Sequence, residues 1–217
     1  MLSQSIQDYL KSIYKLQDNG MVSTTDLAKE LEVTGASVTG MLKRLSTMGM
    51  VDYNSYKGVK LTDAGEKIAL EIVRHHRLLE LYLKEMLDYP LEKVHDEACR
   101  LEHHISDDFL DKINDLLGNP QFDPHGHPIP SEKGEMRKTS GLMLSDVEQG
   151  SKVQISSLDD SDEKLLGYLE ELGLVPNTHL EVIEIGPFNG PIKLNVNGTE
   201  HIIGHEVAGC IYVESTQ

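Results

Sequence analysis

A short stretch of the chain gathers side chains that commonly bind divalent transition metals. Seven of the ten histidines lie between His75 and His127, and Cys99, one of only two cysteines, lies among them. Spacings of three and four residues place side chains on one face of an α-helix, one turn above the next. Imidazole, thiolate and carboxylate groups on one helical face are typical of a metal site. The two sets at these spacings are His76 with Glu80, and His95 with Cys99, Glu102 and His103.

Simpler interpretations of this stretch compete with metal binding. Charged residues four apart on a helix often form only a solvated face. The spacing is not that of a zinc finger, because no CxxC is present, and the HExxH order of a zinc protease is missing. Two neighbouring clusters still favour a metal site. A metallohydrolase with Glu97 or Glu102 as its base is one alternative, and a regulator with an organic effector and structural histidines is another.

The elements ahead of this stretch follow the order of a DNA-binding domain. Apolar residues at helical spacing predict helices over residues 5–16, 25–31 and 36–48. A polar turn at 54–58 between two short apolar-alternating segments predicts a β-hairpin. Three helices followed by a two-stranded wing are typical of a winged helix-turn-helix domain.

The third helix of such a domain enters the major groove, and its front end carries small hydroxyls and cations. Hydroxyl groups can contact base edges or phosphates, whereas lysine and arginine suit phosphates. The wing adds a tyrosine and a lysine for backbone contacts. The candidate DNA-binding residues are Thr34, Ala36, Ser37, Thr39, Lys43 and Arg44 on the helix, and Tyr56 and Lys57 on the wing.

The rest of the chain predicts two further parts, which makes the fold class multidomain α+β. A long helix from residue 62 to about 84, and helices over 91–106 and 107–117, carry a larger apolar face than a monomer needs, so we expect a homodimer. A loop rich in proline and glycine follows, and its Asp123, His125 and His127 are further possible ligands. Short strands and one helix over 162–172 then predict a small SH3-like β-barrel. The expected domains are residues 1–72, 73–140 and 151–217, with a linker at 141–150.

Composition limits where nucleic acid could bind. The chain has a net charge of −16, but residues 1–72 contribute nine acidic and eight basic side chains. The acidity therefore lies behind the first third, and a DNA-facing surface is possible only at the front. No signal peptide and no apolar run of about 20 residues is apparent, so we expect a cytoplasmic protein with cysteines as thiols.

Several motifs resemble the diphtheria-toxin-repressor family of iron- and manganese-dependent repressors. They are VHDEACRLEHHISD at 94–107, HHRLLE at 75–80, DYLKSIYKL at 8–16, GHPIP at 126–130 and LGLVPN at 172–177. The resemblance covers nearly the whole chain. It implies a homodimeric, metal-activated DNA-binding protein with an SH3-like third domain.

The resemblance also implies two metal sites per subunit. One is built from Asp8 with Cys99, Glu102 and His103. The family's iron regulators have Met in place of Asp8, whereas its manganese regulators have Asp there and usually Glu at the position of Cys99. This chain mixes the two patterns, so the resemblance leaves both Mn²⁺ and Fe²⁺ open.

The second implied site uses His76, Glu80 and His95 in iron regulators, completed near Ser157 and Asp160. A related site in streptococcal-type manganese regulators maps instead to Glu80, Asp123, His125 and Asp160, with Asp123 replacing a cysteine. Aspartate is a harder oxygen ligand that suits Mn²⁺ or Fe²⁺. We expect Zn²⁺, Co²⁺, Ni²⁺ or Cd²⁺ to substitute in vitro.

Together the motifs predict a repressor and not an enzyme. It would bind double-stranded operator DNA as a homodimer when it holds Mn²⁺ or Fe²⁺, and would control metal homeostasis genes. We expect no membrane partner and no small-molecule substrate. A metal that joins the first helix to the dimerisation helix would fix the distance between the two recognition helices.

Overall fold

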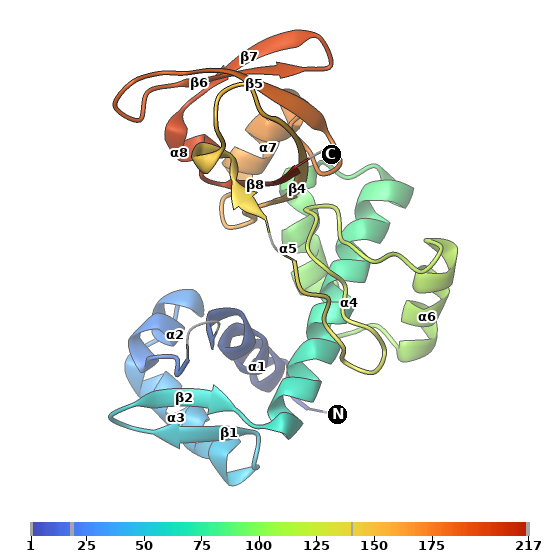
Figure 1. Cartoon of the computed structure of the whole chain (residues 1–217). Helices are drawn as coiled ribbons and strands as arrows, with labels where there is room; N and C mark the ends of the chain where they lie inside the picture. Colours follow the sequence, from blue (N-terminus) through green and yellow to red (C-terminus); the bar gives the residue numbers. More distant parts are fainter. Residues whose placement is uncertain (1, 18–19, 140, 216–217) are drawn as a thin grey trace. The chain divides into compact units, whose positions relative to one another are not determined.

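The protein divides into two compact units. The computed structural model describes residues 2–17, 20–139 and 141–215. The first unit comprises Met1–His76, Leu101–Ser106 and Pro130–Met136. The second unit comprises Arg77–Arg100, Asp107–Ile129 and Arg137–Gln217. Figure 1 traces the elements of both from blue at the N-terminus to red at the C-terminus.

Three helices and a hairpin open the first unit, drawn in blue to cyan in Figure 1. Ser23 and Thr34 cap the second and third helices, because their hydroxyls accept hydrogen bonds from the backbone amides of Asp26 and Ser37. The buried faces meet in one core that includes Leu10, Leu27 and Leu42. The elements are α1 (Gln4–Leu16), α2 (Thr24–Glu30), α3 (Gly35–Thr47), β1 (Val51–Asn54) and β2 (Gly58–Leu61).

The hairpin is fastened to the helices by a third extended segment. β1 and β2 pair antiparallel, and Val59 of β2 also exchanges two backbone hydrogen bonds with Val22, at 2.8 and 2.9 Å. Gly58 is required at this crossing, because its φ is +105° and a Cβ there would lie 2.3 Å from the Val22 carbonyl oxygen. The unit thus has the winged helix-turn-helix order that the sequence predicts.

Three further helices follow the wing in the sequence. α4 (Asp63–Leu87) begins in the first unit and continues into the second, followed by α5 (Leu91–Leu101) and α6 (Asp107–Leu116). The prediction that the helix at 91 runs to about residue 106 is wrong, because α5 ends at Leu101. The backbone amide of His104 bonds to the Leu101 carbonyl at 2.9 Å, a tighter turn than an α-helix makes. Glu102 and His103 therefore lie on a turn after the helix.

A six-stranded antiparallel sheet dominates the second unit, in the order β3-β8-β4-β5-β6-β7. Apolar side chains alternate with polar ones along its strands and form one core with α7 and Leu91. Its elements, drawn from yellow to red in Figure 1, are β3 (Leu142–Met143), η2 (Leu144–Asp146), β4 (Lys152–Leu158), α7 (Glu163–Glu171), β5 (His179–Ile185), β6 (Ile192–Val196), β7 (Thr199–Ile203), α8 (His205–Ala208) and β8 (Ile211–Ser215).

The multidomain α+β class predicted from the sequence is the one observed. β3 and η2 fall within residues 141–150, which were expected to be a linker, and α8 was not expected. These elements have only two to four residues, too few for a hydrophobic period to register. Among the described residues, no helix combines the length and apolarity that crossing a membrane demands.

Candidate metal centre

The first unit gathers a cluster of three possible ligands around α1. Asp8 comes from α1, and Glu102 and His103 come from the turn after α5. Each offers one ligand atom, and these atoms lie within 4.8 Å of one another. His103 Nε2 lies 2.9 Å from Asp8 Oδ1 and 3.1 Å from Glu102 Oε1. The cluster therefore draws together one nitrogen and two carboxylate groups from segments more than 90 residues apart.

His103 is oriented as a metal-binding histidine requires. Its Nδ1 donates to the side-chain oxygen of Gln7 at 2.8 Å, which leaves the lone pair of Nε2 pointing at the cluster. Nε2 is buried and has no hydrogen-bond partner among the described residues. Metal-binding histidines usually donate their second N–H to an oxygen in this way. A buried nitrogen without a donor partner thus fits a cation at this position.

Glu102 is a buried carboxylate surrounded by positive groups. Lys11 Nζ lies 2.6 Å from Oε1, and His76 Nδ1 donates to Oε2 at 2.6 Å. Burial raises the pKa of Glu102, but the close imidazoles of His103 and His76 and the charge of Lys11 outweigh it and hold the pKa well below its usual range. Glu102 is therefore ionised at neutral pH and ready to bind a cation.

The pKa values of Asp8 and His103, the two neighbours of Glu102, are raised and not lowered. Burial raises the pKa of Asp8, and the nearby charges of His103 and Lys11 only partly oppose this. Burial lowers the pKa of His103, but the carboxylates of Glu102 and Asp8 outweigh it, so the pKa is raised. A divalent cation would replace the proton that these groups attract.

A second cluster lies in the loop between α6 and β3, within the second unit. Asp123, His125 and His127 each offer one ligand atom within 4.8 Å of the others. Asp123 Oδ1 accepts backbone hydrogen bonds from His125 and His127, both at 2.9 Å. Its Oδ2 has no hydrogen-bond partner among the described residues, and neither has either ring nitrogen of the fully buried His125. Buried polar atoms left in this state indicate a ligand.

Residues from α4, α5 and the barrel surround this loop. Glu80 Oε1 accepts from His95 Nδ1 at 3.1 Å, and its Oε2 lies 3.8 Å from His125 Nδ1. Asp160 Oδ2 lies 3.7 Å from His127 Nδ1. Burial lowers the pKa of His125, but Glu80, Asp123 and Asp160 outweigh it and raise the pKa. The site therefore has enough negative charge to hold a divalent cation.

The loop of the second cluster is held against β4. The backbone amide of Leu158 donates to the His125 carbonyl at 2.9 Å. Gly126 has φ +88°, and a Cβ there would lie 2.0 Å from the Ser156 carbonyl oxygen. Only glycine allows this approach. The barrel strand thus fixes the position of the His125 ring.

The expected ligands fall into two clusters, one in each unit, and neighbours in the sequence do not always share a cluster. Asp8, Glu102 and His103 meet in the first unit, where His76 pairs with Glu102. In the second unit Glu80, His95, Asp123, His125 and Asp160 gather around one loop, and Cys99 Sγ lies 3.7 Å from His95 Nε2.

Sequence reasoning missed three residues that act on these clusters. Lys11 could have been found from its place one turn after Asp8, and Gln7 from its place beside Asp8. Arg77 directly follows His75 and His76, and within this run only the histidines were considered as functional residues. Its Nε lies 3.4 Å from Asp123 Oδ2, and its Nη1 donates to the Pro128 carbonyl.

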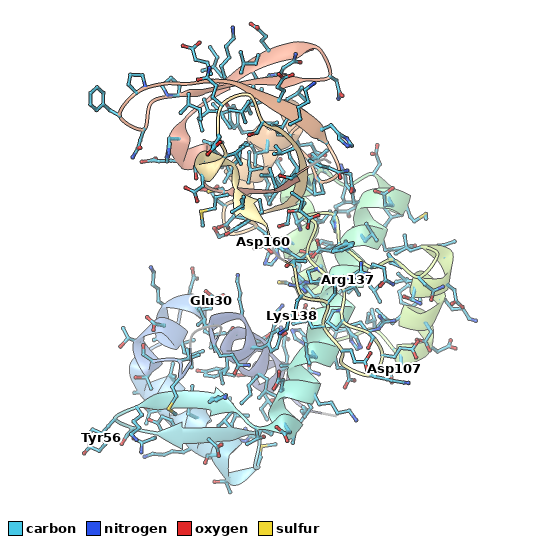
Figure 2. The ribbon with its side chains drawn as sticks, viewed as in Figure 1. Glu30, Tyr56, Asp107, Arg137, Lys138 and Asp160 are labelled. Atoms are coloured by element: carbon cyan, nitrogen blue, oxygen red, sulfur yellow. The ribbon has the colours of Figure 1, made fainter. Side chains whose placement is uncertain are left out.

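The candidate DNA-binding residues lie on exposed parts of the first unit. Thr34 caps α3, and its Oγ1 lies 3.0 Å from the Ser37 hydroxyl. Tyr56 is 98% exposed, and Figure 2 labels it at the tip of the wing. Asn54 Oδ1 holds that tip by accepting the backbone amides of Tyr56 and Lys57. Of the other candidates, Ala36, Lys43 and Arg44 are exposed and Thr39 is half-buried.

A winged helix and buried clusters of candidate metal ligands in one chain are the features of a metal-dependent transcriptional repressor. The family models agree: residues 1–59 match the "Iron dependent repressor, N-terminal DNA binding domain", residues 62–131 the "Iron dependent repressor, metal binding and dimerisation domain", and residues 142–215 the "FeoA domain". The chain belongs to the iron-dependent repressor family, and its third part is the SH3-like domain expected from the sequence.

Known relatives match nearly the whole chain. The iron-dependent repressor IdeR of Mycobacterium tuberculosis is 30% identical over 227 residues, covering 98% of this chain and 98% of that protein. The structure of a manganese-dependent transcriptional repressor in complex with manganese superposes with a TM-score of 0.87 at 35% identity, covering 97% and 100% of the two chains. ScaR with bound Zn²⁺ gives a TM-score of 0.78 at 31% identity, covering 97% and 99%. The resemblance to the diphtheria-toxin-repressor family is confirmed.

Proposed function

We propose that this chain represses metal homeostasis genes by binding operator DNA as a homodimer when it holds Mn²⁺ or Fe²⁺. The observation that carries the proposal is the cluster of Asp8, Glu102 and His103. One ligand of this cluster lies on α1, which packs in the core of the winged helix. The others lie on the turn that ends α5. A cation held by all three would tie the DNA-binding elements to that turn.

The proposed first site consists of Asp8, Glu102 and His103, with Cys99 completing it as in the family pattern. The proposed second site consists of Glu80, Asp123, His125 and Asp160, with His95 bound to Glu80 beside it. His76, the other candidate ligand, supports Glu102 of the first site. The cation supplies concentrated positive charge that binds carboxylate and imidazole groups together. Lys11 must give up its contact with Glu102 when the first site fills, because both cations need the same carboxylate oxygen.

Metal binding would act on DNA affinity through the position of α3. In a two-fold dimer the recognition helices must match half-sites in successive major grooves. Fixing α1 against the turn at 102–104 removes one source of variation in that distance. A coupling free energy of about 1–3 kcal/mol between metal and DNA is ordinary for such a switch.

The ligand chemistry favours Mn²⁺ or Fe²⁺ over zinc. Asp8 and Asp123 are hard oxygen ligands, whereas a zinc site usually has four nitrogen or sulfur ligands. Iron and manganese both appear in the names of relatives, and a relative also takes Zn²⁺ in its crystal, so we expect other divalent metals to substitute in vitro.

We further propose the domains 1–72, 73–140 and 151–217, a regulatory and not a catalytic role, and action in the cytoplasm.

A DNA-binding titration tests the proposal. Operator affinity is measured by fluorescence anisotropy with Mn²⁺, with Fe²⁺ under anaerobic conditions, and with a chelator. We expect roughly 5–150-fold tighter binding with metal, which corresponds to the usual coupling range. Equal affinity in all conditions would contradict the proposal.

A pair of variants locates the effect at the first cluster. Glu102→Gln keeps the shape of the side chain but removes the charge that a metal needs, so its operator affinity should stay at the metal-free level. Glu171→Gln changes an exposed carboxylate at the end of α7 and should respond to metal like the natural protein. A full metal response in Glu102→Gln would exclude the first cluster as the switch.

A further inference from the structure

A polar cavity of about 420 Å³ lies in the second unit, beside the loop that carries Asp123 and His125 (the metal loop). Its walls come from that loop, from the segment leading to β3, from β4 and from the turn before β5. The volume falls within the roughly 300–1,000 Å³ of small-molecule sites. Its lining includes Phe122, Arg137, Lys138, Ser156, Ser157 and Glu214.

Two cations line this cavity. Arg137 and Lys138 follow one another on the segment before β3, where Figure 2 labels both. No ion pair joins either of them to a carboxylate in the described part of the chain, although the protein has 36 acidic and 20 basic side chains. By contrast, Lys84 pairs with Glu170 and Lys193 with Glu200. Both side chains are exposed, and because they line the cavity they place two positive charges where an anionic ligand could reach them.

The Arg137 guanidinium also lies over an aromatic ring. Its guanidinium carbon lies 5.7 Å from the centroid of the Phe122 ring. A guanidinium stacked on a ring keeps its N–H edge free for two parallel hydrogen bonds to an oxyanion. The ring of Phe122 therefore prepares an anion-binding group and adds an apolar wall.

Two adjacent hydroxyls complete a setting for a tetrahedral anion. The register between β4 and β8 shifts between Ile155 and Ser157, so the strand is bulged there. A bulge redirects side chains that would otherwise point to opposite faces, and both Ser156 and Ser157 line the cavity. Neither hydroxyl has a hydrogen bond within residues 2–17, 20–139 and 141–215, so both are available to donate to phosphate oxygens.

The remaining lining favours a ligand that carries hydroxyl groups as well. Glu214 lines the cavity and can accept hydrogen bonds from hydroxyls, as can the amide side chains of Gln154 and Asn177. Asp123 also borders the cavity, but two backbone amides and the nearby Arg77 compensate its charge. Inorganic phosphate alone would leave most of the volume and these acceptors unused.

We propose that this cavity binds a sugar phosphate, with the phosphate on Arg137, Lys138, Ser156 and Ser157 and the sugar hydroxyls toward Glu214. The four phosphate-binding groups are separate from the Glu80, Asp123, His125 and Asp160 side chains proposed as the second metal site, although Asp123 borders the same cavity. It adds a second, organic input to the protein.

Calorimetric titration of the full chain in chelator tests this proposal, so that phosphate cannot act by binding metal. Ribose 5-phosphate is the probe, with inorganic phosphate and ribose as comparison arms. We expect ribose 5-phosphate to bind with a Kd below about 1 mM, inorganic phosphate to bind more weakly and compete, and ribose not to bind. Absence of binding by ribose 5-phosphate, or equal binding of inorganic phosphate, would overturn the proposal.

Matched variants assign the binding to the cavity. The double variant Arg137→Ala/Lys138→Ala should weaken ribose 5-phosphate binding roughly tenfold or more, since it loses charge-assisted hydrogen bonds. The control Lys152→Ala/Lys164→Ala removes the same charge from exposed positions outside the cavity and should bind as the natural protein does. Glu214→Gln should weaken ribose 5-phosphate binding and leave inorganic phosphate unchanged. Unaltered binding by the first variant, with an unaltered melting temperature, would contradict the proposal.

Discussion

At the residue scale, a lysine and protonated histidines neutralise the carboxylates that would bind a metal. Glu102 is ionised because Lys11, His76 and His103 surround it. His103 and His125 attract protons because carboxylates face them. The metal-free protein is thus stabilised by charges that a divalent cation would displace.

The raised histidine pKa values predict how stability changes with pH. A group whose pKa is raised on folding stabilises the protein fully below its unfolded pKa, here 6.5 for His103 and His125, and this contribution is lost as the pH rises through the folded pKa. The melting temperature in chelator should therefore fall as the pH rises above 6.5. With saturating Mn²⁺ the metal should stabilise more as the pH rises, because it needs deprotonated imidazole.

Thermal melts at several pH values, with chelator and with Mn²⁺, measure both trends. The variant His103→Gln should show a shallower decline in chelator, because it lacks one of the titrating groups. A metal-free protein that becomes more stable with rising pH would contradict this account of the clusters.

Asp123 sets the chemical hardness of the second cluster. We expect Asp123→Cys to replace a carboxylate by a thiolate and to shift relative affinity from Mn²⁺ toward Zn²⁺ by roughly tenfold or more, since soft ligands favour zinc. Competition titrations would measure the shift, and Co²⁺ should give a sulfur charge-transfer absorption only in this variant. The exposed Asp52→Cys on β1 is the control. Unchanged metal preference in Asp123→Cys would remove Asp123 from the ligands.

At the scale of elements, the helices could be predicted from the sequence but the clusters only in part. Periodicity predicted α1 to α7, apart from the early end of α5 at Leu101. A period does not show where a helix yields to a turn, so Glu102 and His103 were expected on a helical face. Lys11 and Gln7 were missed because their partners lie more than 90 residues away, a separation that only the fold bridges. Asp123 and His125 were found through their residue types and the resemblance.

Gly126 tests the contact between the metal loop and β4. Gly126→Ala should destabilise the protein by roughly 2–4 kcal/mol, because it adds a clash with the Ser156 carbonyl to an unfavourable φ. Gly150→Ala is the matched control, since Gly150 has φ +85° but open space around its Cβ position, and it should cost only about 1 kcal/mol. Chemical denaturation measures both. Equal costs would mean that backbone strain alone, and not the contact with β4, requires glycine at 126.

At the scale of the whole molecule, charge is divided between a nearly neutral front and an acidic remainder. Residues 1–72 carry nine acidic and eight basic side chains out of 36 and 20 in the chain. We therefore expect DNA affinity to depend on a few cations on α3, because the net negative charge of residues 73–217 repels the DNA backbone.

Removing two of those cations should weaken DNA binding in a recognisable way. Lys43→Ala/Arg44→Ala should lower affinity for all DNA sequences alike and reduce the slope of log affinity against log salt by about one per lost phosphate contact. Lys152→Ala/Lys164→Ala is again the control, with the same charge change on the acidic barrel domain. Anisotropy titrations at several salt concentrations measure the slope. An unchanged slope in the first variant would show that these residues do not contact phosphates.

The hydrogen bond from Leu158 to His125 means that a shortened chain without the barrel would lose support for the second cluster. A truncation after α6 and its loop would keep Asp8, Glu102 and His103, but would remove both the strand that holds His125 and the carboxylate of Asp160. The barrel and the second cluster are therefore inherited or lost together, whereas the first cluster can persist without either. Proteins that lost the barrel should keep one candidate metal site and not two.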